Sequence, residues 1–151
     1  MSGKGATPGQ PPRIGDVAPG QTIGSERVPI QRINLVMYAG ASGDFNVIHW
    51  NERLATMFGL PNVIAHGMLT MAEGARVVTD WLGDPGLLFD YSVRFTKPVV
   101  VPDDDKGALV EIEAVVAAVE PATGQVTVEI SARSGDDDVL GQAVALVRLP
   151  E

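Results

Sequence analysis

One short segment of this chain combines an acid and a base. In Gly43-Asp44-Phe45-Asn46-Val47-Ile48-His49, the carboxyl group of Asp44 and the imidazole of His49 are five positions apart. An imidazole titrates near neutral pH and can accept a proton, and a carboxyl group in a partly dry cleft has a raised pKa and can donate one. The segment therefore indicates proton transfer next to a bound small molecule.

Each of these residues also has a purely structural interpretation. Asp44 can form a turn with its own backbone, and His49 can be a hydrogen-bonded buried residue. Asn46 lies between them and either orients the imidazole or a water, or is an ordinary turn residue. Because an acid and a base occur together within six residues, we favour the chemical interpretation of Asp44 and His49 and leave both open for Asn46.

A second segment, Ala65-His66-Gly67-Met68, begins an apolar pattern with helical spacing. The first N–H groups of a helix have no intrahelical partner and lie at the positive end of the helix dipole. Glycine also lets a ligand carbonyl approach closely. Gly67 is therefore a candidate oxyanion-hole donor, with a plain helix-entry turn as the alternative. We interpret His66 as a structural residue ahead of the helix.

The rest of the sequence predicts the elements that position these residues. Residues 67–82 form the strongest helix, with an apolar repeat at Met68, Met71, Ala72, Ala75, Val78, Trp81 and Leu82. Met68, Met71 and Trp81 are interpreted as core. The small residues at 72, 74 and 75 allow a sheet or ligand to approach. Shorter helices are predicted at 31–40, with Ile33, Val36, Met37 and Gly40 on one side, and at 51–58.

Five strands are predicted, at 21–30, 89–96, 110–118, 126–132 and 139–149. Pro29 favours an edge position for the first strand. Residues 89–96 alternate cleanly, which predicts one buried face, and the last strand is apolar enough to be central. The expected fold is α+β, with a twisted antiparallel sheet around one long central helix. Residues 13–151 form one domain, and the Gly- and Pro-rich residues 1–12 a disordered leader.

Composition excludes several classes of function. The formal charge is −8 with scattered Lys and Arg, which disfavours nucleic-acid binding. There are no cysteines, so there are no disulfides or thiolate metal sites, and we expect a cytoplasmic protein. No segment is apolar enough to span a membrane. Asp44, His49 and His66 match no metal motif, and nucleotide-binding and nucleophile-elbow motifs are absent. We predict neither metal nor cofactor.

Four segments together resemble a known family: residues 38–50, 65–68, 83–86 and 93–98. The first two resemble the paired motifs of the MaoC-like family of hot-dog-fold (R)-specific enoyl thioester hydratases. The resemblance covers about residues 13–149. Within the family, the sequence is most similar to the B subunit of the mycobacterial-type (3R)-hydroxyacyl-ACP dehydratase. The family usually has proline where this chain has Val47, and this departure predicts a looser or re-aimed turn.

The resemblance implies a hot-dog fold and a homodimer or heterodimer with each active site near the subunit interface. It implies Asp44 and His49 as the catalytic pair and the Gly67 N–H as oxyanion donor. The implied reaction is reversible dehydration of (3R)-3-hydroxyacyl thioesters of ACP or CoA to trans-2-enoyl thioesters, in fatty-acid elongation or related acyl metabolism. A hot-dog acyl thioesterase and a non-catalytic acyl-binding partner subunit remain as alternatives.

Overall fold

The computed structural model describes residues 10–151, so most of the predicted leader at residues 1–12 lies outside the described residues. The helices are α1 (Arg32–Ser42), α2 (Glu52–Met57) and α3 (Gly67–Leu82). Short 3-10 helices occur at η1 (Ile14–Asp16), η2 (Val47–His49) and η3 (Pro85–Leu87). The strands are β1 (Thr22–Ile30), β2 (Leu88–Phe95), β3 (Ala108–Glu120), β4 (Gln125–Ser134) and β5 (Asp137–Arg148).

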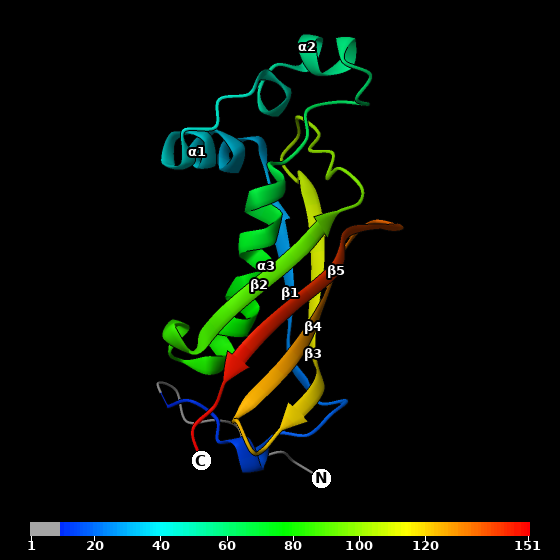
Figure 1. Cartoon of the computed structure of the whole chain (residues 1–151). Helices are drawn as coiled ribbons and strands as arrows, with labels where there is room; N and C mark the ends of the chain where they lie inside the picture. Colours follow the sequence, from blue (N-terminus) through cyan, green and yellow to red (C-terminus); the bar gives the residue numbers. More distant parts are fainter. Residues whose placement is uncertain (1–9) are drawn as a thin grey trace.

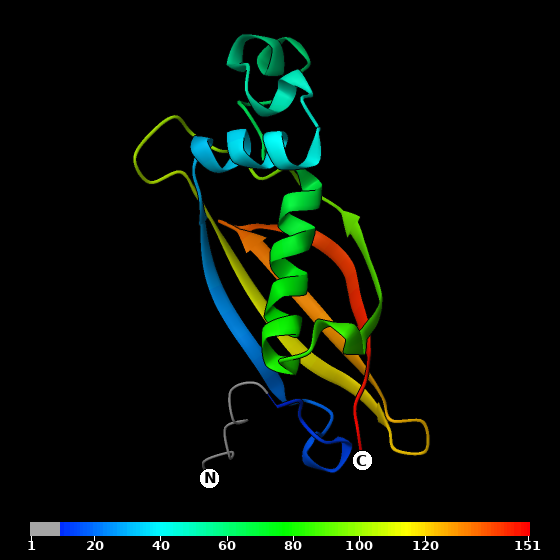
Figure 2. The same cartoon turned by 90° about the vertical axis from the view of Figure 1, so that its left-hand side faces the viewer.

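The strands form one antiparallel sheet in the order β1-β3-β4-β5-β2. The sheet curves around α3, as Figures 1 and 2 show. In the same views, α1 crosses at the N-terminal end of α3, and α2 lies beyond it. β1, which contains Pro29, is at an edge, and β5 is an inner strand. The predicted α+β hot-dog fold is confirmed.

A glycine brings the central helix close to the sheet. A Cβ atom at Gly74 would lie 2.7 Å from the Tyr91 hydroxyl oxygen on β2. That hydroxyl donates a hydrogen bond of 3.0 Å to the carbonyl of Met71, and burial raises the pKa of Tyr91 to about 12. The expectation that small residues in this helix permit a close approach is therefore confirmed at Gly74.

The predicted core stripe of α3 is confirmed at Val78 and Leu82, which are fully buried, but not at its other positions. Met68 is 55% exposed and Ala72 is exposed as well, whereas Met71 and Trp81 are only partly buried. The buried face also contains Thr70, Gly74 and Val77, which the predicted stripe did not include. Glycine and threonine carry weak hydrophobic signals, so a pattern based on apolar side chains misses these two positions.

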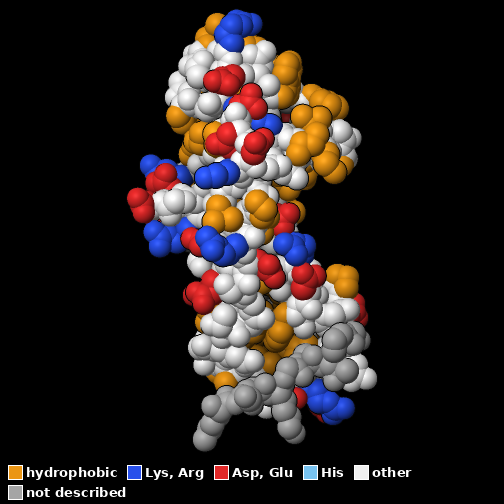
Figure 3. Space-filling model, turned by 180° about the vertical axis from the view of Figure 1, so that it is seen from behind, with side chains coloured by type: hydrophobic (Ala, Val, Ile, Leu, Met, Phe, Trp, Pro, Cys, Tyr) orange, Lys and Arg blue, Asp and Glu red, His pale blue; other side chains and the backbone are white. Residues whose placement is uncertain are grey.

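Two other predicted apolar faces are wholly or partly exposed. Helix α1 buries Leu35 and Ala39, while Ile33, Val36 and Met37 are each more than half exposed. Figure 3 shows apolar side chains gathered over α1 at the upper right of that view. In β2, Phe89 and Phe95 are 49% and 54% exposed, so the clean alternation does not produce the fully buried face that was expected. Tyr91 and Val93, between the two phenylalanines, are partly buried against the core, so the alternating face is covered in its middle and exposed near its ends.

The hairpin strands agree with the predicted alternation. β3 and β4 bury every second residue over most of their length and contribute to a single core with β5 and α3. Within the described residues, no helix combines the length and the apolar character required to cross a bilayer.

Candidate active site

The turn that carries the acid and the base is held by its own polar groups. Asp44 Oδ1 accepts a 3.1 Å hydrogen bond from the backbone N–H of Asn46. Asn46 Oδ1 accepts in turn from the Ile48 N–H at 3.3 Å and so caps η2. The Trp50 indole N–H donates to the Phe45 carbonyl at 3.0 Å. The observed contacts of Asn46 match the turn interpretation, and its role toward a water stays a prediction.

Val47 occupies the first position of η2. Proline is well tolerated there, because the first N–H of a helix has no intrahelical partner. Valine fits the same backbone, and the side-chain caps at Asp44 and Asn46 supply the local constraint. The acid and base therefore remain together despite the departure from the family pattern.

The imidazole of His49 has a defined tautomer. Its Nδ1 lies 2.8 Å from the carbonyl oxygen of Ile64. A carbonyl only accepts, so Nδ1 carries the proton and Nε2 keeps a free lone pair. Nε2 is 3.9 Å from Asp44 Oδ2. This separation lets one oxygen atom lie at about 2.8 Å from both groups, which is the hydrogen-bond distance for such atoms.

The surroundings of the two groups differ. His49 is only 7% exposed, whereas the Asp44 side chain is 50% exposed. The partly dry cleft expected around Asp44 is therefore not formed by this chain alone. A bound substrate or a second subunit would have to cover the carboxyl group.

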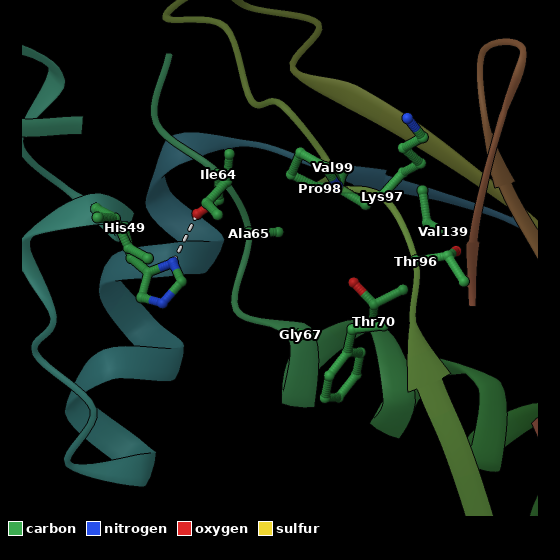
Figure 4. A pocket seen from close by; sticks show the side chains of 12 residues that line it. His49, Ile64, Ala65, Gly67, Thr70, Thr96, Lys97, Pro98, Val99 and Val139 are labelled. Carbon is green, nitrogen blue, oxygen red and sulfur yellow. Dashed lines mark hydrogen bonds between the residues drawn. The ribbon is translucent and has the colours of Figure 1, made fainter. Parts of the chain in front are cut away.

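Backbone pairing fixes the position of the Ile64 carbonyl. Ile64 forms an isolated antiparallel bridge with Val100, and the Ala65 N–H donates to the Val99 carbonyl at 2.8 Å. The segment that leads into α3 is thus attached to the segment after β2. In Figure 4 the dashed line marks the resulting bond from His49 to Ile64.

His49 and Gly67 line the same cavity, whose volume is about 360 Å³ (Figure 4). Gly67 is the first residue of α3, so its N–H has no intrahelical partner. A Cβ atom at Gly67 would lie 3.1 Å from the ring of Phe95, so glycine allows this ring to pack closely against the start of α3. The other walls are mainly apolar and come from Ile48, Ile64, Ala65, Pro98, Val99 and Val139.

Sequence reasoning missed Thr70 as a member of the site. Thr70 lines the cavity and is only 3% exposed. It lies three residues after Gly67, on the same face of α3, and this spacing is the signal that would have found it. Lys97 also lines the cavity, whereas Arg76 is paired on the surface with Glu73 and Asp80.

His66 is fully buried ahead of α3, as predicted, but it also contacts both members of the acid–base pair. Its Nε2 is 3.1 Å from the Asp44 carbonyl oxygen, and its ring is stacked on His49 with centroids 3.8 Å apart. Ligand atoms of Asp44, His49 and His66 lie within 4.8 Å of one another. Imidazole lone pairs lie in the ring planes, and planes only 21° apart do not converge on one ion. The absence of a metal stays a prediction.

Several groups act on the pKa of His49, and their net effect lowers it from the ordinary value of 6.5. Burial is the largest cause, because it disfavours the charged imidazolium. The Ile64 carbonyl and the Asp44 carboxylate raise the pKa, and His66 lowers it. The site therefore holds a neutral base around neutral pH.

Comparison with known proteins adds a family and several relatives. The family model described as "MaoC like domain" matches residues 16–134. A 3-hydroxyacyl-thioester dehydratase X of Mycobacterium tuberculosis is 46% identical over 65 residues, which are 43% of this chain and 22% of that protein. A 3-hydroxybutyryl-CoA dehydratase of Methylorubrum extorquens is 29% identical over 123 residues, covering 81% of this chain and 74% of that protein.

A solved structure described as a MaoC-like dehydratase superposes with a TM-score of 0.88 at 39% identity. The match covers 94% of this chain and 43% of that chain. The chain thus spans less than half of this solved chain and about a fifth of the mycobacterial relative.

Proposed function

The chain belongs to the MaoC-like dehydratase family of hot-dog proteins, and we propose that it catalyses the reversible dehydration of (3R)-3-hydroxyacyl thioesters to trans-2-enoyl thioesters. The observation that carries the proposal is His49, whose Nε2 has a free lone pair 3.9 Å from the Asp44 carboxylate and which lines the same cavity as Gly67. A base, an acid and an oxyanion donor are the groups that elimination next to a thioester requires.

In the dehydration direction, His49 Nε2 removes a proton from C2. The electron pair of the C–H bond becomes the C2–C3 double bond as the C3–O bond breaks. Negative charge that develops on the thioester oxygen is stabilised by the Gly67 N–H and the dipole of α3. Asp44 binds the departing hydroxyl, and the acid–base pair returns one proton to this oxygen, so water leaves and no net proton is consumed. Hydration is the reverse.

The test is an assay of the purified chain on trans-2-enoyl-CoA substrates of graded length, with the products identified. Hydration consumes the double bond and gives a 3-hydroxyacyl thioester. A thioesterase would instead release a free thiol. A non-catalytic partner subunit would give neither product alone, and no reaction with or without added hot-dog partners would contradict the proposal.

The carrier and the assembly are part of the proposal. We propose ACP or CoA thioesters as substrates, with Lys97 at the cavity rim near the carrier arm. We propose pairing with a second hot-dog subunit, as a homodimer or in the manner of the resembled B subunit. The exposed apolar face of α1 and the half-exposed Asp44 support this pairing. We also propose that residues 13–151 form one domain, since the buried residues from Val17 to Leu149 form one cluster.

The pH dependence of hydration should reflect the lowered pKa of His49. The base is active when neutral, so kcat/KM is expected to rise with pH and reach half its maximum below pH 6.5. The same shift acts on stability. The unfolded chain binds this proton more readily, so the contribution of His49 to the free energy of unfolding is complete above pH 6.5 and is lost as pH falls toward the lowered pKa. An acid limb centred above pH 6.5 would argue against His49 as the base.

Replacing Gly67 by proline tests the oxyanion donor. Proline removes the N–H at a helix position where it is tolerated, and His66 before it has φ −60° and ψ 130°, which suits a following proline. We expect kcat to fall by about 10²–10³-fold, the usual cost of losing one such donor. Gly67→Ala is the matched control, because it adds a Cβ against Phe95 but keeps the N–H. Equal turnover of the two variants would remove Gly67 from the mechanism.

A further inference from the structure

We propose that His66 is a positioning residue of the acid–base pair, which holds the backbone of Asp44 through one ring nitrogen and supports the imidazole of His49 with its ring face. This inference rests on the proposed function for its kinetic consequences. Its structural basis is the contact of one buried side chain with both groups.

The first contact fixes the tautomer of His66. Its Nε2 is 3.1 Å from the Asp44 carbonyl oxygen, and because a carbonyl only accepts, the proton is on Nε2. The turn that carries the acid is thereby attached to the residue that begins α3, 22 positions later in the chain. The bond links the acid-bearing turn to the helix that supplies the oxyanion donor.

The second contact constrains the base. The rings of His66 and His49 are stacked with centroids 3.8 Å apart, and the ring of Tyr38 meets His66 at 4.8 Å and 60°. The imidazole of His49 is therefore fixed in its plane by the Ile64 carbonyl and across its face by His66. Two independent constraints of this kind keep Nε2 directed toward Asp44.

The buried Nδ1 atom of His66 indicates that this residue does more than fill space in the core. His66 Nδ1 is buried and has no hydrogen-bond partner among the described residues. An unpaired buried polar atom is unfavourable, and a phenyl ring would fill the same space without one. The histidine is thus a poor choice for packing alone, and its Nε2–H bond to Asp44 is what phenylalanine lacks.

His66 also acts on the basicity of His49. Among the described residues, the titratable groups that act on the pKa of His49 are Asp44 and His66, and Tyr38 contacts His66. The contact with His66 lowers the pKa of His49, so replacing His66 should make His49 more basic.

Two substitutions test separately the contact of His66 with the Asp44 carbonyl and its contact with the His49 ring. His66→Phe keeps a stacked ring but loses the donor to the Asp44 carbonyl. His66→Gln loses the ring but keeps an amide N–H that can reach this carbonyl. We expect His66→Phe to lower kcat by about tenfold to a hundredfold, as loss of orienting groups generally does. His66→Gln should regain most of this loss.

Proton NMR titration gives a readout that does not depend on turnover. The chain has two histidines, so the single imidazole left in either His66 variant is His49, and a His49→Gln variant assigns the wild-type signals. We expect the pKa of His49 to be higher in both His66 variants than in the wild type. The acid limb of kcat/KM should move in the same direction.

An unchanged pKa of His49 in both variants would overturn the proposal, as would wild-type kcat in His66→Phe. If His66→Phe does not fold, the His49 titration in His66→Gln decides alone. A wild-type chain without hydratase activity would contradict the proposed function, while the titration would still test the contact between the two rings.

Discussion

His49→Gln is expected to lower kcat/KM for hydration of a trans-2-enoyl thioester by about 10²–10⁴-fold, which is the typical contribution of a general base. The expected loss follows from the geometry. Nδ1 donates its proton to the Ile64 carbonyl, so the lone pair on Nε2 is the one that His49 offers to the substrate. Glutamine has a similar length and also carries an N–H donor, but its amide is not basic near neutral pH.

The measurement is steady-state hydration at a pH above 6.5, where the wild-type base is neutral. Ile48→Val is the matched control, since Ile48 lines the same cavity and lies next to His49 but has no ionisable group. The control should lose much less activity, because only one methyl group changes. Turnover of His49→Gln at the level of this control would exclude His49 as the base.

Asp44→Asn is expected to cause a loss of similar size, about 10²–10⁴-fold in kcat/KM. The amide oxygen can still accept the Asn46 N–H that Asp44 Oδ1 accepts at 3.1 Å, so the turn should persist. The amide of asparagine cannot exchange a proton with the hydroxyl or water that lies between the side chains of residues 44 and 49. Because the side chain is half exposed, the melting temperature should change little.

Asp90→Asn provides the comparison for Asp44→Asn, because Asp90 is also an exposed aspartate but lies on β2, outside the turn that carries Asp44 and His49. Both variants remove one negative charge. Only Asp44→Asn should lose hydration, and the thermal melts of the two should be similar. Full activity in Asp44→Asn, or equal losses in the two variants, would contradict the assigned role.

Local features of the site were accessible from the sequence. The acid and base are five residues apart in one turn, and short-range caps at Asp44 and Asn46 bring their side chains to 3.9 Å. The start of α3 at Gly67 follows from the onset of helical periodicity. Such features depend on contacts between near neighbours in the chain, which a single sequence records directly.

Contacts between distant segments were not accessible in the same way. His66 was interpreted as structural, and nothing in its local pattern indicates that its ring stacks on His49. This contact depends on the attachment of Ile64 and Ala65 to the segment after β2. The same holds for the half exposure of Asp44, which is a property of the assembled surface rather than of the motif.

Helix α3 shows why apolar periodicity predicted the helix but only part of its buried face. The apolar repeat correctly predicts a helix at 67–82, yet Met68 faces outward and Gly74 faces the sheet. A methionine side chain is flexible enough to remain exposed. A glycine has no side chain, so its backbone can pack closely against the sheet. Hydrophobicity alone would predict that Met68 is the more buried of the two residues.

The central claim is that Asp44 and His49 act together on one bound thioester. The most direct measurement is the disappearance of the enoyl double bond of crotonyl-CoA, with chiral identification of the product, for the wild type and for the Asp44→Asn/His49→Gln double variant. We predict that the wild type forms the (3R)-3-hydroxy product and that the double variant falls to the background rate. Water addition by the double variant at the wild-type rate would place the chemistry elsewhere and contradict the mechanism.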